Sequence, residues 1–170
     1  MKTNLKTIAL LAVASLGTVT ARAVETVGDI ATNFTIVNHA NGEPLSLHDY
    51  EGSVILIDFF AYWCPYCRAQ SPQIEDSING YYHSREGNPY GVPVTVITVS
   101  FDCSNQSRTD QLINQFGLEI VADDCSAVSY RLFVENGQPH YVVINGLANA
   151  AGIQQWEILH SSSGYGGTAA

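Results

Sequence analysis

The chain has 170 residues, the usual size of one domain. Hydrophobic residues make up 46% and charged residues 14%, which is enough apolar material for a buried core. The net charge of −9 argues against binding to nucleic acid or to an anionic membrane surface, because both attract basic proteins.

The first 23 residues have the pattern of a secretory signal peptide. Two lysines precede the apolar run Thr7–Thr20, and residues 21–23 (Ala-Arg-Ala) form a small-x-small cleavage site. We therefore predict cleavage after Ala23 and a periplasmic or secreted protein that is not inserted in the membrane. An uncleaved N-terminal anchor is the alternative, although the apolar run is short for a membrane span. Cleavage would leave four arginines against sixteen acids, a net charge of −12.

The mature chain is expected to begin with a β-hairpin. Residues 34–37 form a strand candidate, Asn41-Gly42 is a strong turn signal, and a return strand begins at residue 44. A single helical turn over residues 47–50 follows.

The stretch VILIDFF, residues 54–60, is apolar except for Asp58 and predicts a central strand buried on both faces. A helix should begin after Cys64 and run to about Tyr82, with a kink at Pro72, because proline cannot donate an N–H.

The second half of the chain alternates short strands and helices after a loop. We expect the loop over 83–93, strands over 94–99, 118–121, 141–144 and 153–159, and helices over 109–116 and 126–133. This alternation predicts an α/β fold in one domain over residues 24–160. The Ser/Gly-rich residues 161–170 are expected to be a flexible tail.

Cys64 and Cys67 carry the strongest functional signal. Two residues between cysteines allow a reversible disulfide across one helical turn, and Pro65 suits the first turn of a helix. If Cys64 begins the helix, the helix dipole and free N–H groups favour its thiolate. Cys64 would then attack and Cys67 would resolve the mixed disulfide. Trp63, Pro65 and Tyr66 flank the pair with surface on which a client protein can pack.

A structural zinc half-site and an inert structural disulfide are the alternatives for this pair. Zinc needs two further ligands. Cys103 and Cys125 are 22 positions apart, a spacing that does not form a second zinc knuckle.

Asp58 is the second signal, because burial of a carboxylate raises its pKa. It lies six positions before Cys64 and could accept the proton of Cys67 when the inner thiol attacks. The alternatives are an exposed Asp58 on an edge strand, or a buried Asp58 whose carboxylate is satisfied by the backbone.

Cys103 and Cys125 each follow a predicted strand, so both should emerge at the edge of the sheet that carries Cys64. A structural disulfide between them would stabilise the fold by about 3 kcal/mol. The alternative is a redox relay that exchanges with the Cys64–Cys67 pair.

The stretch IDFFAYWCPYC, followed by Pro72, resembles the active site of the thioredoxin superfamily. The longer stretch from ATNFTIVNHANGEPLSLHDY to CPYC is similar to exported TlpA/ResA-like members, which share an N-terminal hairpin with the AhpC/TSA redoxins. The resemblance covers residues 28–160. It implies a thioredoxin-like three-layer α/β/α sandwich with an N-terminal β-hairpin extension. It also implies a thiol–disulfide oxidoreductase with protein substrates, and a cis-proline at Pro139 facing the cysteines. We predict a monomer that needs no cofactor and exchanges disulfides with client or electron-donor dithiol proteins.

Several positions depart from the TlpA/ResA pattern. Gln70 stands where ResA-like proteins often have Glu, and Gln138, in the substrate groove before Pro139, stands where Thr, Val or Ile is usual. The Pro-Tyr dipeptide between the cysteines is the glutaredoxin pair. With the missing Glu, it suggests a less reducing potential than that of thioredoxin. The usual C-terminal helix is missing after Leu159, so one face of the sheet should be less covered unless another segment compensates.

Two other activities remain open. A thiol peroxidase of the peroxiredoxin kind fits the hairpin, but that chemistry needs a lone peroxidatic cysteine with Thr and Arg around it. A Sco-like copper chaperone would use the two cysteines and His140, although those proteins have three residues between the cysteines. We predict no bound metal. The other histidines are expected at the surface: His39, His48, His83 and His160.

Overall fold

The structure is a computed structural model that describes residues 23–148 and 152–164. The predicted signal peptide, apart from Ala23, and residues 165–170 of the predicted tail lie outside the described residues. No helix in residues 23–148 or 152–164 has both the length and the hydropathy to cross a bilayer.

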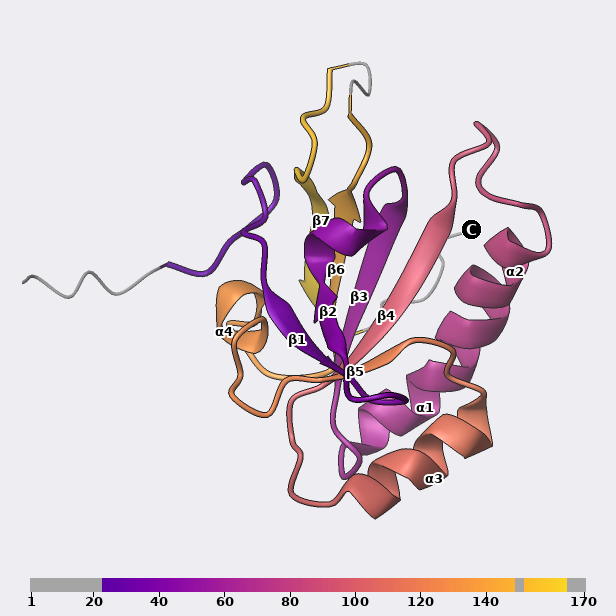
Figure 1. The fold of residues 1–170 in the computed structure, drawn as a ribbon, viewed down its shortest axis with the longest axis vertical. Helices are drawn as coiled ribbons and strands as arrows, with labels where there is room; N and C mark the ends of the chain where they lie inside the picture. The colour runs from indigo at the N-terminus through magenta and orange to yellow at the C-terminus, as the bar shows by residue number, and fades with distance from the viewer. Residues whose placement is uncertain (1–22, 149–151, 165–170) are drawn as a thin grey trace, which may run out of the picture.

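A mixed β-sheet forms the centre of the described chain, with its strands in the order β2-β1-β5-β4-β3-β6-β7 (Figure 1). The strands are β1 Thr35–Asn38, β2 Pro44–Ser46, β3 Val54–Phe60, β4 Val94–Ser100, β5 Val121–Asp123, β6 His140–Asn145 and β7 Ile158–Ser163. The hairpin of β1 and β2 confirms the predicted N-terminal extension and joins the sheet through β5.

The direction of the strands brings the functional segments to one edge. β3, β4 and β5 are parallel, so the segments that follow them leave the sheet at the same edge. β6 is antiparallel to β3, so the chain enters β6 at that edge. Cys64, Cys103, Cys125 and Pro139 therefore lie on segments at a common edge, as expected for the cysteines from the predicted strand order.

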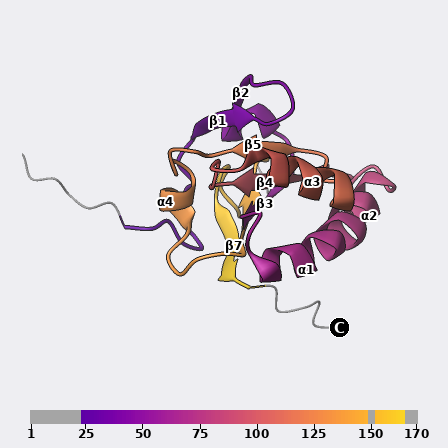
Figure 2. The ribbon, with the colours of Figure 1, turned by 90° about the horizontal axis from the view of Figure 1, so that it is seen from below.

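Helices cover the two faces of the sheet unequally (Figure 2). One face carries α1 Pro65–Ile74, a π-helical turn η2 Glu75–Asn79, α2 Gly80–His83 and α3 Gln106–Phe116. The other carries a 3₁₀ turn η1 Leu47–Tyr50, α4 Tyr130–Phe133 and the chain that leads into β1. This arrangement confirms the predicted three-layer α/β/α sandwich, with one thin outer layer.

Apolar side chains fill both interfaces of the sheet. Phe34 and Phe133 meet edge to face, 5.9 Å between ring centroids, in the core under α4. On the opposite face, Leu56 and Ile74 pack together beneath α1. β3 lies between β4 and β6 and is almost fully buried, so the prediction of a central strand is confirmed.

Two helices differ from their predicted limits because side chains bind backbone N–H groups. The Asn105 side chain accepts the N–H of Arg108, which caps α3 and starts it three residues earlier than predicted. The helix predicted over 126–133 is reduced to the single turn α4. The Asp124 carboxylate accepts the N–H groups of Val128 and Tyr130, so this segment satisfies its donors without a long helix.

The predicted limits of β5 and β7 are wrong. Residues 118–121 were expected as a strand, but β5 begins only at Val121. The last strand was expected over 153–159 with a flexible tail from 161, yet β7 extends to Ser163. Pairing with β6 explains this difference, because Ser161 and Ser163 bind a buried histidine of β6 through their hydroxyls.

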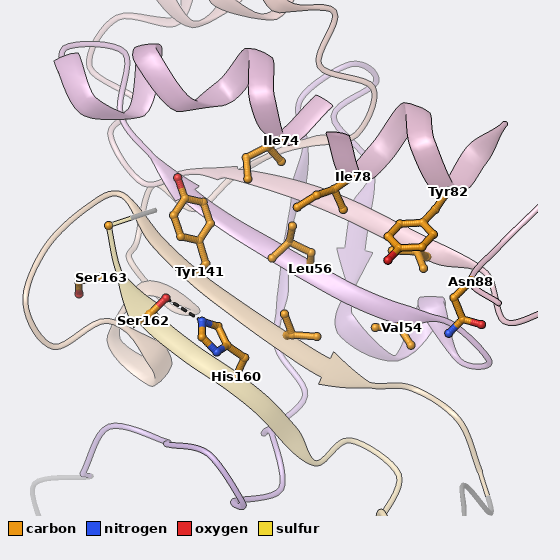
Figure 3. A pocket seen from close by; sticks show the side chains of 13 residues that line it. Val54, Leu56, Ile74, Ile78, Tyr82, Asn88, Tyr141, His160, Ser162 and Ser163 are labelled. Atoms are coloured by element: carbon orange, nitrogen blue, oxygen red, sulfur yellow. Dashed lines mark hydrogen bonds between the residues drawn. The ribbon is translucent and has the colours of Figure 1, made fainter. Parts of the chain in front are cut away.

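Within residues 23–148 and 152–164, no helix packs on the sheet face beside β7, which agrees with the expectation that one face of the sheet is less covered. A pocket of about 640 Å³ lies there between the sheet and the helices η2 and α2 (Figure 3). Leu56, Ile78 and Tyr82 point into it, and His160 and Ser162 stand on its β7 side. Neither Cys64 nor Cys67 lines this pocket, so it is separate from the site described next.

Candidate active site

The helix α1 begins directly at the cysteine pair. Cys64 has an extended backbone and occupies the N-cap, and Pro65 is the first helical residue. The Cys64 Sγ accepts the backbone N–H of Cys67 at 3.1 Å. Cys64 and Cys67 form a disulfide with α-carbons 5.3 Å apart. A thiolate on Cys64 would therefore meet an N–H donor and the positive end of a helix dipole.

The exposed surface around the cysteine pair comes from neighbouring side chains, because the cysteines themselves are buried. Cys64 is only 3% exposed, whereas Trp63 is 50% and Tyr66 is 71% exposed. The Gln138–Pro139 peptide bond is cis, as the resemblance implied, and the Gln138 carbonyl oxygen lies 4.0 Å from the Cys64 Sγ. Exposed aromatic rings and the Gln138–Pro139 segment therefore flank Cys64.

The loop after β4 holds the tryptophan of the site. The indole N–H of Trp63 donates to Asp102 Oδ2 at 2.6 Å, and the Tyr62 hydroxyl lies 3.1 Å from Ser104 Oγ. Hydrogen bonds from Ser104, with a smaller one from Trp63, lower the pKa of Asp102, so this carboxylate is charged at neutral pH. The sequence reasoning did not identify Asp102, although its place after a buried strand is where functional side chains gather in α/β sheets.

Tyr130 links the two sides of the site and was also missed. Its hydroxyl donates to the Gln138 Oε1 at 3.2 Å. Its ring lies 4.3 Å from that of Phe101, which in turn meets Trp63 edge to face at 6.4 Å. An aromatic chain therefore connects the segment before the cis-proline with the tryptophan beside Cys64.

Asp58 lies in the middle of β3, the strand that leads into the segment of Cys64. It is 2% exposed, so the alternative of an exposed residue on an edge strand is wrong. Burial, together with the charge of Glu75, raises its pKa from an ordinary 3.8 to about 7. Within the described residues its Oδ1 has no hydrogen-bond partner, so the carboxyl is not fully satisfied by the backbone.

Glu75 is a second buried acid on this face, and the sequence reasoning missed it. Its Oε2 accepts a hydrogen bond from the Asn79 side chain at 2.8 Å within the π-helical turn. Burial raises the pKa of Glu75, the charges of Glu119 and Asp76 raise it further, and the Asn79 hydrogen bond opposes this shift. Position 70, where ResA-like proteins often have Glu, holds a neutral amide that accepts the Tyr141 hydroxyl at 2.6 Å.

The second cysteine pair forms a disulfide in a different setting. Cys103 and Cys125 are joined across a separation of 22 residues. Cys125 is exposed and Cys103 is half-buried. Acidic residues precede both cysteines, Asp102 on one side and the pair Asp123-Asp124 on the other.

His140 lies in β6 but is engaged away from the sulfurs. It is 5% exposed, and its ring nitrogens lie 3.0 Å from the hydroxyls of Ser161 and Ser163. Burial and the nearby charge of His160 lower its pKa. This environment disfavours the copper alternative, because both ring nitrogens already have partners. In the described ranges, no three His, Cys, Asp or Glu side chains are arranged to hold a metal ion.

His39 was predicted to lie at the surface, but its side chain is only 12% exposed, so this prediction is wrong. Its ring nitrogens lie 2.8 Å from Asp110 and 3.0 Å from Asp123. Desolvation lowers its pKa, but the hydrogen bonds of the two carboxylates outweigh that effect and raise it overall. The other three predicted surface histidines are exposed: His48, His83 and His160.

A model of the AhpC/TSA family matches residues 27–148. The chain belongs to the AhpC/TSA family. This AhpC/TSA chain is also 30% identical over 95 residues to the thiol-disulfide oxidoreductase ResA of Oceanobacillus iheyensis. The match covers 54% of this chain and 45% of ResA, so the chain spans less than half the length of that relative.

Solved structures show that this AhpC/TSA chain has a thioredoxin-like fold. A putative thiol:disulfide interchange protein DsbE from Chlorobium tepidum matches with a TM-score of 0.65 and 23% identity, over 84% of this chain and 88% of that one. The thioredoxin domain of a thiol-disulfide oxidoreductase from Bacteroides vulgatus matches with a TM-score of 0.63 and 19% identity, over 83% and 91%.

Proposed function

We propose that this protein is a thiol–disulfide oxidoreductase that exchanges disulfides with client proteins through Cys64 and Cys67. The observation that carries the proposal is the disulfide at the start of α1, where the Cys67 N–H donates to the Cys64 Sγ. The similarity to ResA and to structures described as thiol–disulfide oxidoreductases supports it.

The reaction follows from the positions of the two sulfurs and the buried acid. In the reducing direction, the Cys64 thiolate attacks one sulfur of a client disulfide, and the other client sulfur leaves as a thiolate. Cys67 then gives its proton to Asp58 and attacks the Cys64 Sγ, which releases the second client thiol. The client gains two electrons, and Cys64 and Cys67 become a disulfide. The oxidising direction is the reverse.

Pro139 and the aromatic side chains shape the groove in this proposal. The Gln138 carbonyl before Pro139 lies beside Cys64, and the client would pack on the exposed surface of Trp63, Pro65 and Tyr66. The protein requires no cofactor, because electrons pass to or from another dithiol protein. It acts as a monomer in an exported compartment. The signal-peptide pattern of residues 1–23 supports export.

Trapping the mixed disulfide tests the proposal directly. Cys67→Ser should accumulate a covalent complex between Cys64 and a disulfide-containing client such as insulin, because the resolving thiol is missing. Cys64→Ser is the matched control and should form no such complex. Absence of a complex with Cys67→Ser, together with no insulin reduction by the unchanged protein, would refute the proposal.

A thiol peroxidase is the second candidate, supported by the AhpC/TSA match. A peroxidatic Cys64 would reduce hydrogen peroxide to water and become a sulfenic acid. Robust peroxide consumption by Cys67→Ser, with a thiol reductant present, would favour this activity over disulfide exchange. Loss of peroxide turnover in all variants would remove it.

The reduction potential decides the direction of the proposed reaction. A value near that of thioredoxin, about −270 mV, would indicate a reductant and would overturn the expectation of a less reducing pair. A clearly higher potential against glutathione would favour an oxidant or isomerase.

A further inference from the structure

A polar groove lies beside the candidate active site, between helices α1 and α3. These helices run side by side at the end of the molecule that carries the cysteines (Figures 1 and 2). The groove has a volume of about 360 Å³, and the residues that line it are Tyr62, Arg68, Arg108, Gln111, Leu112 and Gln115.

The groove gathers two of the four arginines that the chain has after residue 22. Arg68 and Arg108 are both exposed. Within the residues that the structure describes, neither guanidinium has a carboxylate or any other hydrogen-bond partner. By contrast, Arg85 stacks on the Tyr81 ring at 3.8 Å and donates to the Tyr81 carbonyl. Two unpaired cations in a chain with sixteen acids form a local positive site on an otherwise acidic protein.

The spacing along α3 explains why no acid neutralises this site. Arg108, Leu112 and Gln115 recur at helical spacing and face α1. Asp110 is displaced around the helix by two residues, and it lies 2.8 Å from His39 on the side of the N-terminal hairpin. The fold therefore separates the one nearby helical acid from the two arginines.

The groove is continuous with the cysteine pair. Leu112 packs in the same apolar cluster as Cys64 and Cys67. Arg68 directly follows Cys67, and its backbone N–H donates to the Cys64 carbonyl at 3.2 Å. Tyr62, at the groove's other side, is two residues before Cys64. Residues that line the groove therefore contact the cysteine pair, and a group bound there lies close to it.

We propose that this groove binds an acidic side chain of a polypeptide client, close in sequence to the client's reacting cysteine. Guanidinium groups match carboxylates in geometry and charge, and the two glutamine amides add neutral donors. The exposed rings of Trp63 and Tyr66 extend the surface beyond what a small thiol can cover, which favours a polypeptide. The inference rests on the proposed oxidoreductase function and adds a substrate preference to it.

Two disulfide-bridged peptides test the preference. They differ only in a Glu or a Gln next to one cysteine, and the reduced protein is assayed for kcat/KM with each at low and high salt. The unchanged protein should prefer the Glu peptide by about threefold at low salt. The variant Arg68→Gln with Arg108→Gln should lose the preference and keep its rate with the Gln peptide. Arg85→Gln is the matched control and should keep the preference.

Each alternative outcome decides the matter. Equal rates with both peptides, or a preference that survives in the double variant, would overturn the inference. A preference lost equally in Arg85→Gln would show an effect of overall charge and overturn it too. The inference would also be overturned if the rate of reduction of oxidised glutathione, but of neither peptide, depended on Arg68 and Arg108.

A binding measurement separates the groove from the proposed chemistry. A Glu peptide without cysteine, titrated into the oxidised protein, should shift the arginine Nε–H NMR signals of Arg68 and Arg108 but not that of Arg85. If these signals shift but no peptide is reduced, the oxidoreductase function is refuted and the proposal that the groove binds a carboxylate stands. No shifts would overturn the groove even where both peptides are reduced.

Discussion

The two disulfides of this protein lie at the same edge of the sheet but in opposite environments. Cys64–Cys67 is nearly buried, spans three residues, and begins a helix. Cys103–Cys125 spans 22 residues, links two loops, and leaves Cys125 exposed. The first pair has an N–H donor at its outer sulfur and follows the strand that holds the buried Asp58, whereas the second pair has acidic neighbours in sequence on both sides.

The contrast teaches that proximity of sulfurs alone does not make a redox site. A reactive pair needs a stabilised thiolate and a group that accepts the second proton. Acidic neighbours disfavour a thiolate, so the environment of Cys103 and Cys125 suits a cross-link rather than a relay. We therefore propose that the second disulfide is structural and fixes the loop that carries Asp102.

The largest expected effect separates the two pairs outright. Cys64→Ser should lower insulin reduction by at least about 10³-fold, because it removes the attacking sulfur. The double variant Cys103→Ser with Cys125→Ser should keep most of the activity. If the second pair were a relay, the double variant would lose insulin reduction although its Cys64–Cys67 pair still formed a disulfide.

Asp58→Asn should give the next largest effect on catalysis. It should slow resolution of the mixed disulfide by about 10²-fold, since no carboxylate remains to accept the proton of Cys67. In the unchanged protein the resolution rate should rise with pH through about 7, the pKa of Asp58, because only the ionised carboxylate accepts a proton. Stopped-flow measurement of the second step at several pH values checks this. An unchanged profile in the variant would exclude Asp58 as the base.

The same substitution should stabilise the fold at high pH. Between the unfolded pKa near 3.8 and the folded pKa of about 7, the unfolded Asp58 is ionised and the folded one is protonated. The unchanged protein therefore loses stability as pH rises through this window, by up to about 4 kcal/mol. The gain from Asp58→Asn should be absent below pH 4 and complete above pH 7. Glu43→Gln, an exposed acid, is the control in urea unfolding.

Loss of the second disulfide should act on stability more than on chemistry. Removing Cys103–Cys125 should lower the free energy of unfolding by about 3 kcal/mol, because the closed loop is long. Removing Cys64–Cys67 by a double Ser substitution is the matched control and should cost less, since its loop is only three residues long. Equal losses in the two variants would contradict the cross-link assignment.

Local patterns in the sequence predicted the centre of the site well. The apolar run around Asp58 and the Cys-x-x-Cys motif are contiguous, and a strand followed by a helix needs no distant contact to be recognised. The parallel strands then placed all four cysteines at one edge. The hairpin was also expected from its turn signals, and a less covered sheet face was expected from the Ser/Gly-rich composition after Leu159.

What the sequence did not predict depends on contacts between distant segments. Glu75 looks like a surface acid of a helix, and only packing against the sheet buries it near Asp58. Tyr130 reaches Gln138 from a turn whose N–H groups the distant Asp124 carboxylate accepts. The serines of β7 have a tail-like composition, and only pairing with β6 orders them. Periodicity contains no information about such partners.

Substitution of Asp102 should have the smallest effect on catalysis, and it tests how the two disulfides are connected. Its carboxylate accepts the indole N–H of Trp63, and its neighbour Cys103 fixes the loop from the other side. Asp102→Ala should raise the KM for a client about threefold with kcat unchanged, as expected for the loss of one exposed hydrogen bond. Asp102→Asn keeps an acceptor and should recover most of the loss.

Fluorescence anisotropy of Trp63, in a Trp156→Phe background that removes the other tryptophan of the chain, reports the position of the ring. Asp102→Ala and the Cys103→Ser, Cys125→Ser variant should both increase its mobility, because each releases the same loop. If the disulfide variant leaves Trp63 as ordered as before, the second disulfide does not act on the redox site through this loop. Its role is then confined to the stability of the fold.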